Sequence, residues 1–212
     1  MKRAGAPAGR ASAGLVLLHG RGAGAEDVLS LLDVLGLPDV AGLGPEAPGR
    51  SWWPTSFLAP SAEMEPHVAR GVKAVRDAVA TFEAEGLARD RIWLAGFSQG
   101  ACLALEAFAR EGAGLAGAFG FSGALVGTAD AEGGPQPGLY GHGPKRFDYP
   151  AASGKVWLSV HQRDPHIPLQ RVEESAEALR RAGAEVGMQV YPGAGHAVMR
   201  EDLAALRSAL NR

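Results

Sequence analysis

The sequence predicts an α/β fold built on a doubly wound, mainly parallel sheet. Short apolar runs, which are typical of buried strands, alternate along the chain with longer segments whose apolar residues recur at helical spacing. Glycine and polar residues follow several of these runs directly, and in such sheets the ligand site lies outside the carboxyl ends of the strands. A length of 212 residues with 46% hydrophobic content suits a single compact domain spanning residues 1–212.

Six apolar runs are expected to form the strands. They occupy residues 15–18, 40–47, 92–95, 115–121, 155–160 and 186–191. Helical spacing is expected near residues 25–35, over residues 65–85, from residue 99 onward, over residues 171–181 and in a closing segment with Leu203, Leu206 and Leu210. Residues 1–13 carry no apolar run, so we expect them to form a flexible N-terminus.

Composition and charge narrow the class of partner. Lys and Arg total 21 against 23 for Asp and Glu, and no stretch concentrates basic residues, so we expect a small-molecule substrate and no nucleic acid. Cys102 is the single cysteine, which excludes an internal disulfide and fits a reducing compartment. Residues 4–14 lack the apolar core of a signal peptide, and residues 15–18 are too short to span a bilayer. These features predict a soluble cytoplasmic protein without integral membrane contact.

A long Gly- and Pro-rich connection covers residues 127–154. A connection of this length is expected to be either a lid or pocket wall, or a plain surface loop, and the sequence leaves both open. Within it, Lys145 and Arg146 are expected to form a solvated pair.

Residues 96–100, Gly-Phe-Ser-Gln-Gly, join the apolar run at 92–95 to the helical pattern that begins at Gln99. A G-x-S-x-G segment between a strand and a helix is typical of a nucleophile elbow, which holds the serine side chain exposed on a sharp, strained turn. The helix that follows presents unpaired N–H groups and the positive end of its dipole, which favour an oxyanion. This context predicts Ser98 as a catalytic nucleophile.

Residues 19–24, His-Gly-Arg-Gly-Ala-Gly, form a second loop after a strand. In a hydrolase such a loop supplies another oxyanion donor, a backbone N–H, and its glycines let the chain pass close to the substrate. The glycine spacing also suggests a dinucleotide-binding loop. That interpretation needs G-x-G-x-x-G and an acidic residue at the end of the next strand, which residues 45–47 supply poorly.

A serine nucleophile needs a base of near-neutral pKa and a carboxylate that orients the base. Ser98, Asp164 and His196 each lie at or just beyond a predicted strand end, and their order along the chain is that of the α/β-hydrolases. Of the six histidines, His161 and His166 share a loop with Asp164, whereas His196 follows a glycine on a separate loop. The sequence therefore predicts His196 as the base and Asp164 as the acid.

Two alternatives compete for these residues. Asp148 is a rival acid, but it lies in the irregular segment and not past a strand. His161, Asp164 and His166 combine two imidazoles with one carboxylate, as in the iron site of a metal-dependent oxygenase. Assigning Asp164 to a metal would leave the hydrolytic triad without an acid, so we expect no metal and no cofactor.

Four residues near the predicted rim are expected to contact the substrate: Trp52, Trp53, His19 and Ile167. The two adjacent tryptophans lie in a loop, where full burial of both is not expected. One of them is expected to face a ligand, and capping the edge of the core is the alternative for either residue.

The chain resembles the phospholipase/carboxylesterase family of α/β-hydrolases, which includes the acyl-protein thioesterases. Four ordered blocks carry the resemblance, at residues 17–22, 96–101, 164–168 and 193–196, and it extends from residue 15 to about residue 210. The resemblance implies Ser98, Asp164 and His196 as the triad, with backbone N–H groups of Arg21 and Gln99 as oxyanion donors. It also implies hydrolysis of carboxylic esters or thioesters without a cofactor, often in a homodimer.

The resemblance is incomplete in features that bear on the substrate. Family members commonly have His-Gly in the acid block where this chain has His161 and Gln162, and the Trp52-Trp53 pair looks particular to a subgroup. The expected function is a serine hydrolase, of the carboxylesterase or lysophospholipase type, for esters or thioesters of small to medium acyl groups. A non-catalytic scaffold that binds a small molecule is the alternative from another class.

Overall fold

A computed structural model describes residues 1–129 and 145–211. Its strands are β1 (Lys2–Gly5), β2 (Ala13–Leu18), β3 (Val40–Gly44), β4 (Ile92–Phe97), β5 (Gly117–Phe121), β6 (Lys155–Arg163) and β7 (Glu185–Ala194). Its helices are α1 (Ala25–Leu29), α2 (Leu31–Leu35), α3 (Ser61–Ala84), α4 (Gln99–Glu111), α5 (Leu169–Ala182) and α6 (Arg200–Leu210). Short 3-10 turns cover Ala8–Arg10, Pro48–Arg50 and Arg89–Arg91.

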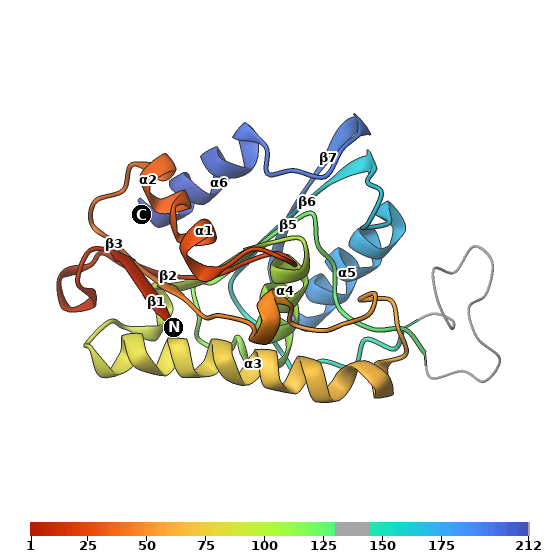
Figure 1. The fold of residues 1–212 in the computed structure, drawn as a ribbon, viewed down its shortest axis with the longest axis horizontal. Helices are drawn as coiled ribbons and strands as arrows, with labels where there is room; N and C mark the ends of the chain where they lie inside the picture. Colours follow the sequence, from red (N-terminus) through yellow and green to blue (C-terminus); the bar gives the residue numbers. More distant parts are fainter. Residues whose placement is uncertain (130–144, 212) are drawn as a thin grey trace.

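The strands form one sheet with the order β1-β3-β2-β4-β5-β6-β7. All neighbouring pairs are parallel except β1 with β3, so the predicted doubly wound, mainly parallel sheet is confirmed. Helices α3, α4 and α5 cover one face, and α1, α2 and α6 cover the other (Figure 1). The inner strands β2 and β4 are buried on both faces of the sheet, which explains their continuous apolar character.

The N-terminal segment differs from the expectation. Residues expected to be flexible contribute strand β1, which pairs antiparallel with β3 in the register Lys2 with Gly44 through Gly5 with Ala41. The side chains of this edge strand are largely exposed, so buried apolar residues do not alternate with exposed polar ones along it. Backbone pairing with β3 holds it in place, and that interaction leaves no pattern of side chains in the sequence.

The predicted helix near residues 25–35 is divided in two at Ser30. Leu29, Leu32 and Leu35 enter the core between these helices and the sheet. Val28 and Leu31, which were expected on the same face, pack against this core cluster but remain half-buried. No helix in the described parts of the chain combines the length and the apolar character needed to cross a bilayer.

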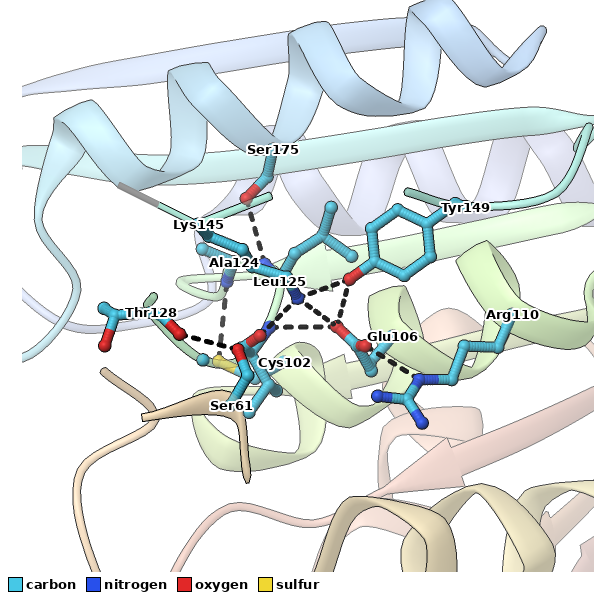
Figure 2. A network of polar contacts seen from close by, with 12 residues as sticks. Ser61, Cys102, Glu106, Arg110, Ala124, Leu125, Thr128, Lys145, Tyr149 and Ser175 are labelled. Carbon is cyan, nitrogen blue, oxygen red and sulfur yellow. Dashed lines mark hydrogen bonds and ion pairs between the residues drawn. The ribbon is translucent and has the colours of Figure 1, made fainter. Parts of the chain in front are cut away.

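A buried carboxylate ties the segments on both sides of residues 130–144 to α4 (Figure 2). Oxygens of Glu106, which is fully buried, accept hydrogen bonds from Arg110 Nε at 2.8 Å, Val126 N at 3.0 Å and the Tyr149 hydroxyl at 2.8 Å. The Lys145 ammonium lies 3.3 Å from the same carboxylate and also donates to the carbonyl of Val126. The expectation that Lys145 is solvated is therefore wrong.

The predicted connection at residues 127–154 falls largely on residues 130–144, which lie outside the described part of the chain, and so does the suggested lid. The flanking residues 145–154 contain neither helix nor strand. Asp148, the rival acid, is exposed and lies 3.5 Å from the guanidinium of Arg146.

Candidate active site

Three predicted residues meet at the carboxyl edge of the sheet. Ser98 lies between β4 and α4, Asp164 follows β6 directly, and His196 lies two residues after β7. His196 Nε2 is 2.8 Å from Ser98 Oγ, and His196 Nδ1 is 2.8 Å from Asp164 Oδ2. Residues that follow β4, β6 and β7 at one edge of the sheet thus form a continuous hydrogen-bonded chain from carboxylate through imidazole to hydroxyl.

The backbone at Ser98 has the geometry of a strained turn. Its φ of 55° and ψ of −119° lie in a region that residues with a side chain rarely occupy. A side chain at Gly96 would overlap the backbone of Gly100, and one at Gly100 would overlap the backbone of Leu18. Ser98 N donates to Phe121 O at 2.9 Å, and Ser98 O accepts from Cys102 N at 3.0 Å, so packing and hydrogen bonds maintain the turn.

The carboxylate of Asp164 is fully buried and accepts three N–H groups. Oδ2 faces the imidazole, while Oδ1 accepts from the backbone N of His166 at 2.8 Å and of Ile167 at 2.9 Å. These bonds fix the carboxylate within its own loop and leave one oxygen for His196. The His196 ring also packs on Phe97 with ring centroids 4.8 Å apart. The imidazole orientation is therefore set by its carboxylate partner and by an aromatic wall.

Two backbone N–H groups beside Ser98 have no acceptor among the residues that the structure describes. They belong to Arg21, in the loop after β2, and to Gln99, the first residue of α4. The first N–H groups of a helix have no intrahelical partner, which makes them available to an anion. The neighbouring Gly22 N donates instead to Arg50 O at 2.8 Å, which fixes the course of the loop.

The side chains of Arg21 and Gln99 hold one common segment, residues 51–55. Arg21 donates to Pro54 O at 2.8 Å and to Thr55 O at 2.5 Å. The Gln99 amide donates to Trp53 O at 2.9 Å and accepts from Trp52 N at 2.9 Å. The two loops with free N–H groups are therefore connected to each other through residues 51–55.

The main cavity beside Ser98 has a volume of about 690 Å³. Its apolar wall comes from Trp53, Phe57, Phe97, Cys102 and Ile167. Two of the expected substrate contacts, Trp53 and Ile167, thus line this cavity. Phe57 and Cys102 were not expected there; Phe57 lies outside any strand or helix, and the helical position of Cys102 indicated only burial.

The other two expected substrate contacts, His19 and Trp52, support the loops and do not line the main cavity. His19 Nε2 accepts a hydrogen bond from Ala47 N at 3.1 Å, and Trp52 Nε1 donates to His19 O at 3.0 Å. Both tryptophans are buried, Trp52 at 3% and Trp53 at 1% exposure, which corrects the expectation that they would not be buried together. Burial is possible in this loop because backbone and side-chain acceptors satisfy its polar groups.

The alternative metal site has little structural basis. Within residues 1–129 and 145–211, no group of three or more His, Cys, Asp or Glu side chains has an arrangement that could hold a metal ion. His161 is buried against Tyr191, while Asp164 faces His196 and two backbone N–H groups.

The sheet is doubly wound and mainly parallel, and at its carboxyl edge a serine lies on a strained strand-to-helix turn. The serine hydroxyl is hydrogen-bonded to a histidine, which is hydrogen-bonded to an aspartate. These features define the class of α/β-hydrolases. The model of the phospholipase/carboxylesterase family matches residues 3–137. The chain belongs to this family.

Comparisons with individual proteins agree with the family. A phospholipase/carboxylesterase crystal structure from Dyadobacter fermentans superposes with a TM-score of 0.86 at 34% identity, covering 100% of this chain and 95% of that one. A carboxylesterase from Bacillus cereus shares the fold, with a TM-score of 0.68 at 18% identity over 99% of this chain and 92% of that one. Acyl-protein thioesterase 1 of Gibberella zeae is 29% identical over 127 residues, 60% of this chain, so the match spans only 50% of that curated relative.

Proposed function

We propose that the protein is a serine hydrolase that cleaves carboxylic esters or thioesters through an acyl-enzyme. The observation that carries the proposal is the pair of 2.8 Å hydrogen bonds that join Ser98 to His196 and His196 to Asp164. A hydroxyl bonded to an imidazole, which is oriented by a carboxylate, is the arrangement that activates serine for attack on a carbonyl carbon.

In the proposed mechanism, His196 Nε2 accepts the proton of Ser98 as Oγ attacks the substrate carbonyl. Asp164 holds the imidazole tautomer and stabilises the imidazolium that forms. The negative oxygen of the tetrahedral intermediate accepts hydrogen bonds from the backbone N–H groups of Arg21 and Gln99. His196 then protonates the leaving oxygen or sulfur, and water hydrolyses the acyl-enzyme by the same sequence of proton transfers.

The main cavity supports substrates with small to medium acyl groups. Its volume of about 690 Å³ is within the range of ligand pockets, and Trp53, Phe57 and Ile167 supply apolar walls that carry no ionised group. The Gibberella zeae relative is named a thioesterase, and we include thioesters for that reason. A homodimer and a cytoplasmic location remain predictions.

A fluorophosphonate serine probe tests the proposal directly. We expect intact-mass analysis to detect one adduct on the wild type and none on Ser98→Ala. In the same variant we expect kcat for a p-nitrophenyl ester to fall about 10⁴- to 10⁶-fold, because the nucleophile is lost while the oxyanion donors remain. No adduct on the folded wild-type protein would favour a non-catalytic scaffold that binds a small molecule.

A further inference from the structure

His161 lies between the two segments that carry the acid and the base of the proposed triad. It belongs to the end of β6, and its backbone oxygen accepts a hydrogen bond from Asp164 N at 3.2 Å. In the sheet it is in register with Tyr191 of the neighbouring strand β7, after which the chain leads to His196. His161 is 7% exposed and does not line the main cavity. Any effect of its side chain on the reaction therefore passes through its neighbours.

The pairing of β6 with β7 becomes irregular directly after His161. Regular parallel register extends as far as His161 with Tyr191, and Arg163 then pairs with Ala194, so two steps along β6 correspond to three along β7. An extra residue of this kind bends the strand that contains it and changes the direction of the side chains near it. The strand pairing is thus irregular where the chain leads to His196, and other contacts must help to hold this segment.

The imidazole of His161 fills the space beside Gly195, the residue that precedes His196. A side chain on Gly195 would approach Cδ2 and Nε2 of His161 to 2.7 Å and Cε1 to 2.9 Å, which is closer than Cβ atoms approach their neighbours in proteins. The φ angle of Gly195 is not in the left-handed region, so the imidazole is what excludes a side chain there. The imidazole also packs on the ring of Tyr191, with ring centroids 5.4 Å apart, and the Tyr191 hydroxyl donates to Asp202 at 2.8 Å.

The contact between His161 and Gly195 depends on the shape of the ring. His161 Nδ1 is buried and has no hydrogen-bond partner among the residues that the structure describes. A buried polar atom without a partner is uncommon and lowers stability. The imidazole is therefore present at a cost to the fold, at a position where its ring contacts the segment of the proposed base.

We propose that His161 is a positioning residue of the triad, whose imidazole supports the backbone at Gly195 and so keeps His196 Nε2 at hydrogen-bond distance from Ser98 Oγ. This inference rests on the proposed function. The distance between these two atoms is 2.8 Å, and a displacement of about 1 Å in catalytic geometry lowers a rate by up to about 100-fold. Phe97 packs on the ring of His196 itself, whereas His161 supports the backbone that precedes it.

A pair of complementary changes in side-chain size tests this role. Gly195→Ala places a methyl group against the imidazole, His161→Ala removes the imidazole, and the double variant provides the space that the methyl group needs. Gly187→Ala is the matched control, because Gly187 is also a half-buried glycine and a side chain on it would meet an aromatic ring of β6, that of Trp157, at 2.9 Å. Gly187 lies near the start of β7, far along the strand from His196. Circular dichroism and thermal melting verify that each variant folds.

We expect Gly195→Ala to lower kcat for p-nitrophenyl butyrate about 10- to 100-fold, with KM nearly unchanged, because the triad is displaced while the cavity is retained. The rate of labelling by the fluorophosphonate should fall by a similar factor. His161→Ala should lower kcat about tenfold, and the double variant should be no slower than His161→Ala. Gly187→Ala should keep the wild-type kcat whatever its melting temperature.

Independent effects would overturn the positioning role: the double variant would then lose the product of the two single factors, as residues that share no contact do. Wild-type kcat in folded His161→Ala would overturn it as well. If Gly195→Ala does not fold, the double variant is compared with His161→Ala, where equal kcat supports the role and a further loss of about tenfold contradicts it. Absence of labelling in the wild type overturns the proposed function itself, and this inference with it.

Discussion

The side-chain amide of Gln99 donates to the backbone oxygen of Trp53 at 2.9 Å. The same residue begins α4 and carries one of the two proposed oxyanion donors on its backbone. Gln99 therefore connects the N-terminus of the helix to residues 51–55, to which the Arg21 side chain is also bonded. The two loops that carry the proposed donors are thus connected to each other through side-chain hydrogen bonds to one segment.

Gln99→Ala tests this connection, because the variant retains the backbone N–H and loses only the side-chain bonds. We expect kcat for a p-nitrophenyl ester to fall about 10- to 100-fold with a smaller change in KM, since a displacement near 1 Å in catalytic geometry costs about this much. Gln170→Ala, which removes an exposed amide bonded to Glu174, is the matched control and should have wild-type kinetics. A Gln99→Ala enzyme with wild-type kcat would contradict a positioning role for this side chain.

The variant Asp164→Asn tests whether Asp164 or Asp148 is the acid of the triad. An amide can donate to His196 Nδ1 and stabilise the wrong tautomer, so we expect kcat to fall about 10⁴-fold. Asp148→Asn, at an exposed carboxylate paired with Arg146, should leave kcat unchanged. Steady-state kinetics on the two purified variants make the comparison, and a large loss in Asp148→Asn alone would transfer the acid role to that residue.

The meeting of residues at strand ends could be predicted from sequence, and hydrogen bonds between loops could not. Ser98, Asp164 and His196 were expected to lie together because each is at the end of a strand, and the topology of a parallel sheet brings such positions to one edge. The structural roles of His19 and Trp52 depend on hydrogen bonds across 28 and 33 residues, for which no local pattern exists.

The prediction of charged contacts and of helix boundaries is limited as well. Lys145 was expected in solvent because it stands next to Arg146, yet its partner Glu106 lies 39 residues away. The helical spacing of Val28, Leu31, Leu32 and Leu35 suggested one apolar face. All four side chains do pack on one core cluster, and what the spacing did not indicate is the break between the two helices at Ser30.

Cys102 lines the main cavity, but we expect its thiol to be unreactive. Burial raises its pKa to about 12, so the reactive thiolate is scarce at pH 8. Iodoacetamide at pH 8 should leave the native protein unmodified for hours and should alkylate it completely in guanidinium chloride, as read by intact mass. Labelling of the native protein within minutes would show that the helix around Cys102 opens readily.

We expect the Glu106 carboxylate to make the free energy of unfolding depend on pH in the acid range. Burial alone would raise the pKa of this carboxyl, but Lys145, Arg110 and the Tyr149 hydroxyl reverse the effect and hold the pKa below its usual value. A carboxyl whose pKa is lowered by folding adds stability above the unfolded-state pKa and loses it as pH falls through the folded-state pKa. The contribution of Glu106 should therefore be complete at pH 7 and decline in acid.

Glu106→Gln should lower the free energy of unfolding at pH 7 by about 3 to 5 kcal/mol, because the buried Lys145 loses its charged partner (Figure 2). Urea denaturation between pH 7 and pH 3 measures this difference, and we expect it to shrink as the pH falls. Glu65→Gln is the matched control: its carboxylate pairs with Arg110 at the surface, where an ion pair contributes about 0 to 1 kcal/mol. Equal losses in the two variants, or a difference independent of pH, would mean that the ionised form of Glu106 does not stabilise the fold.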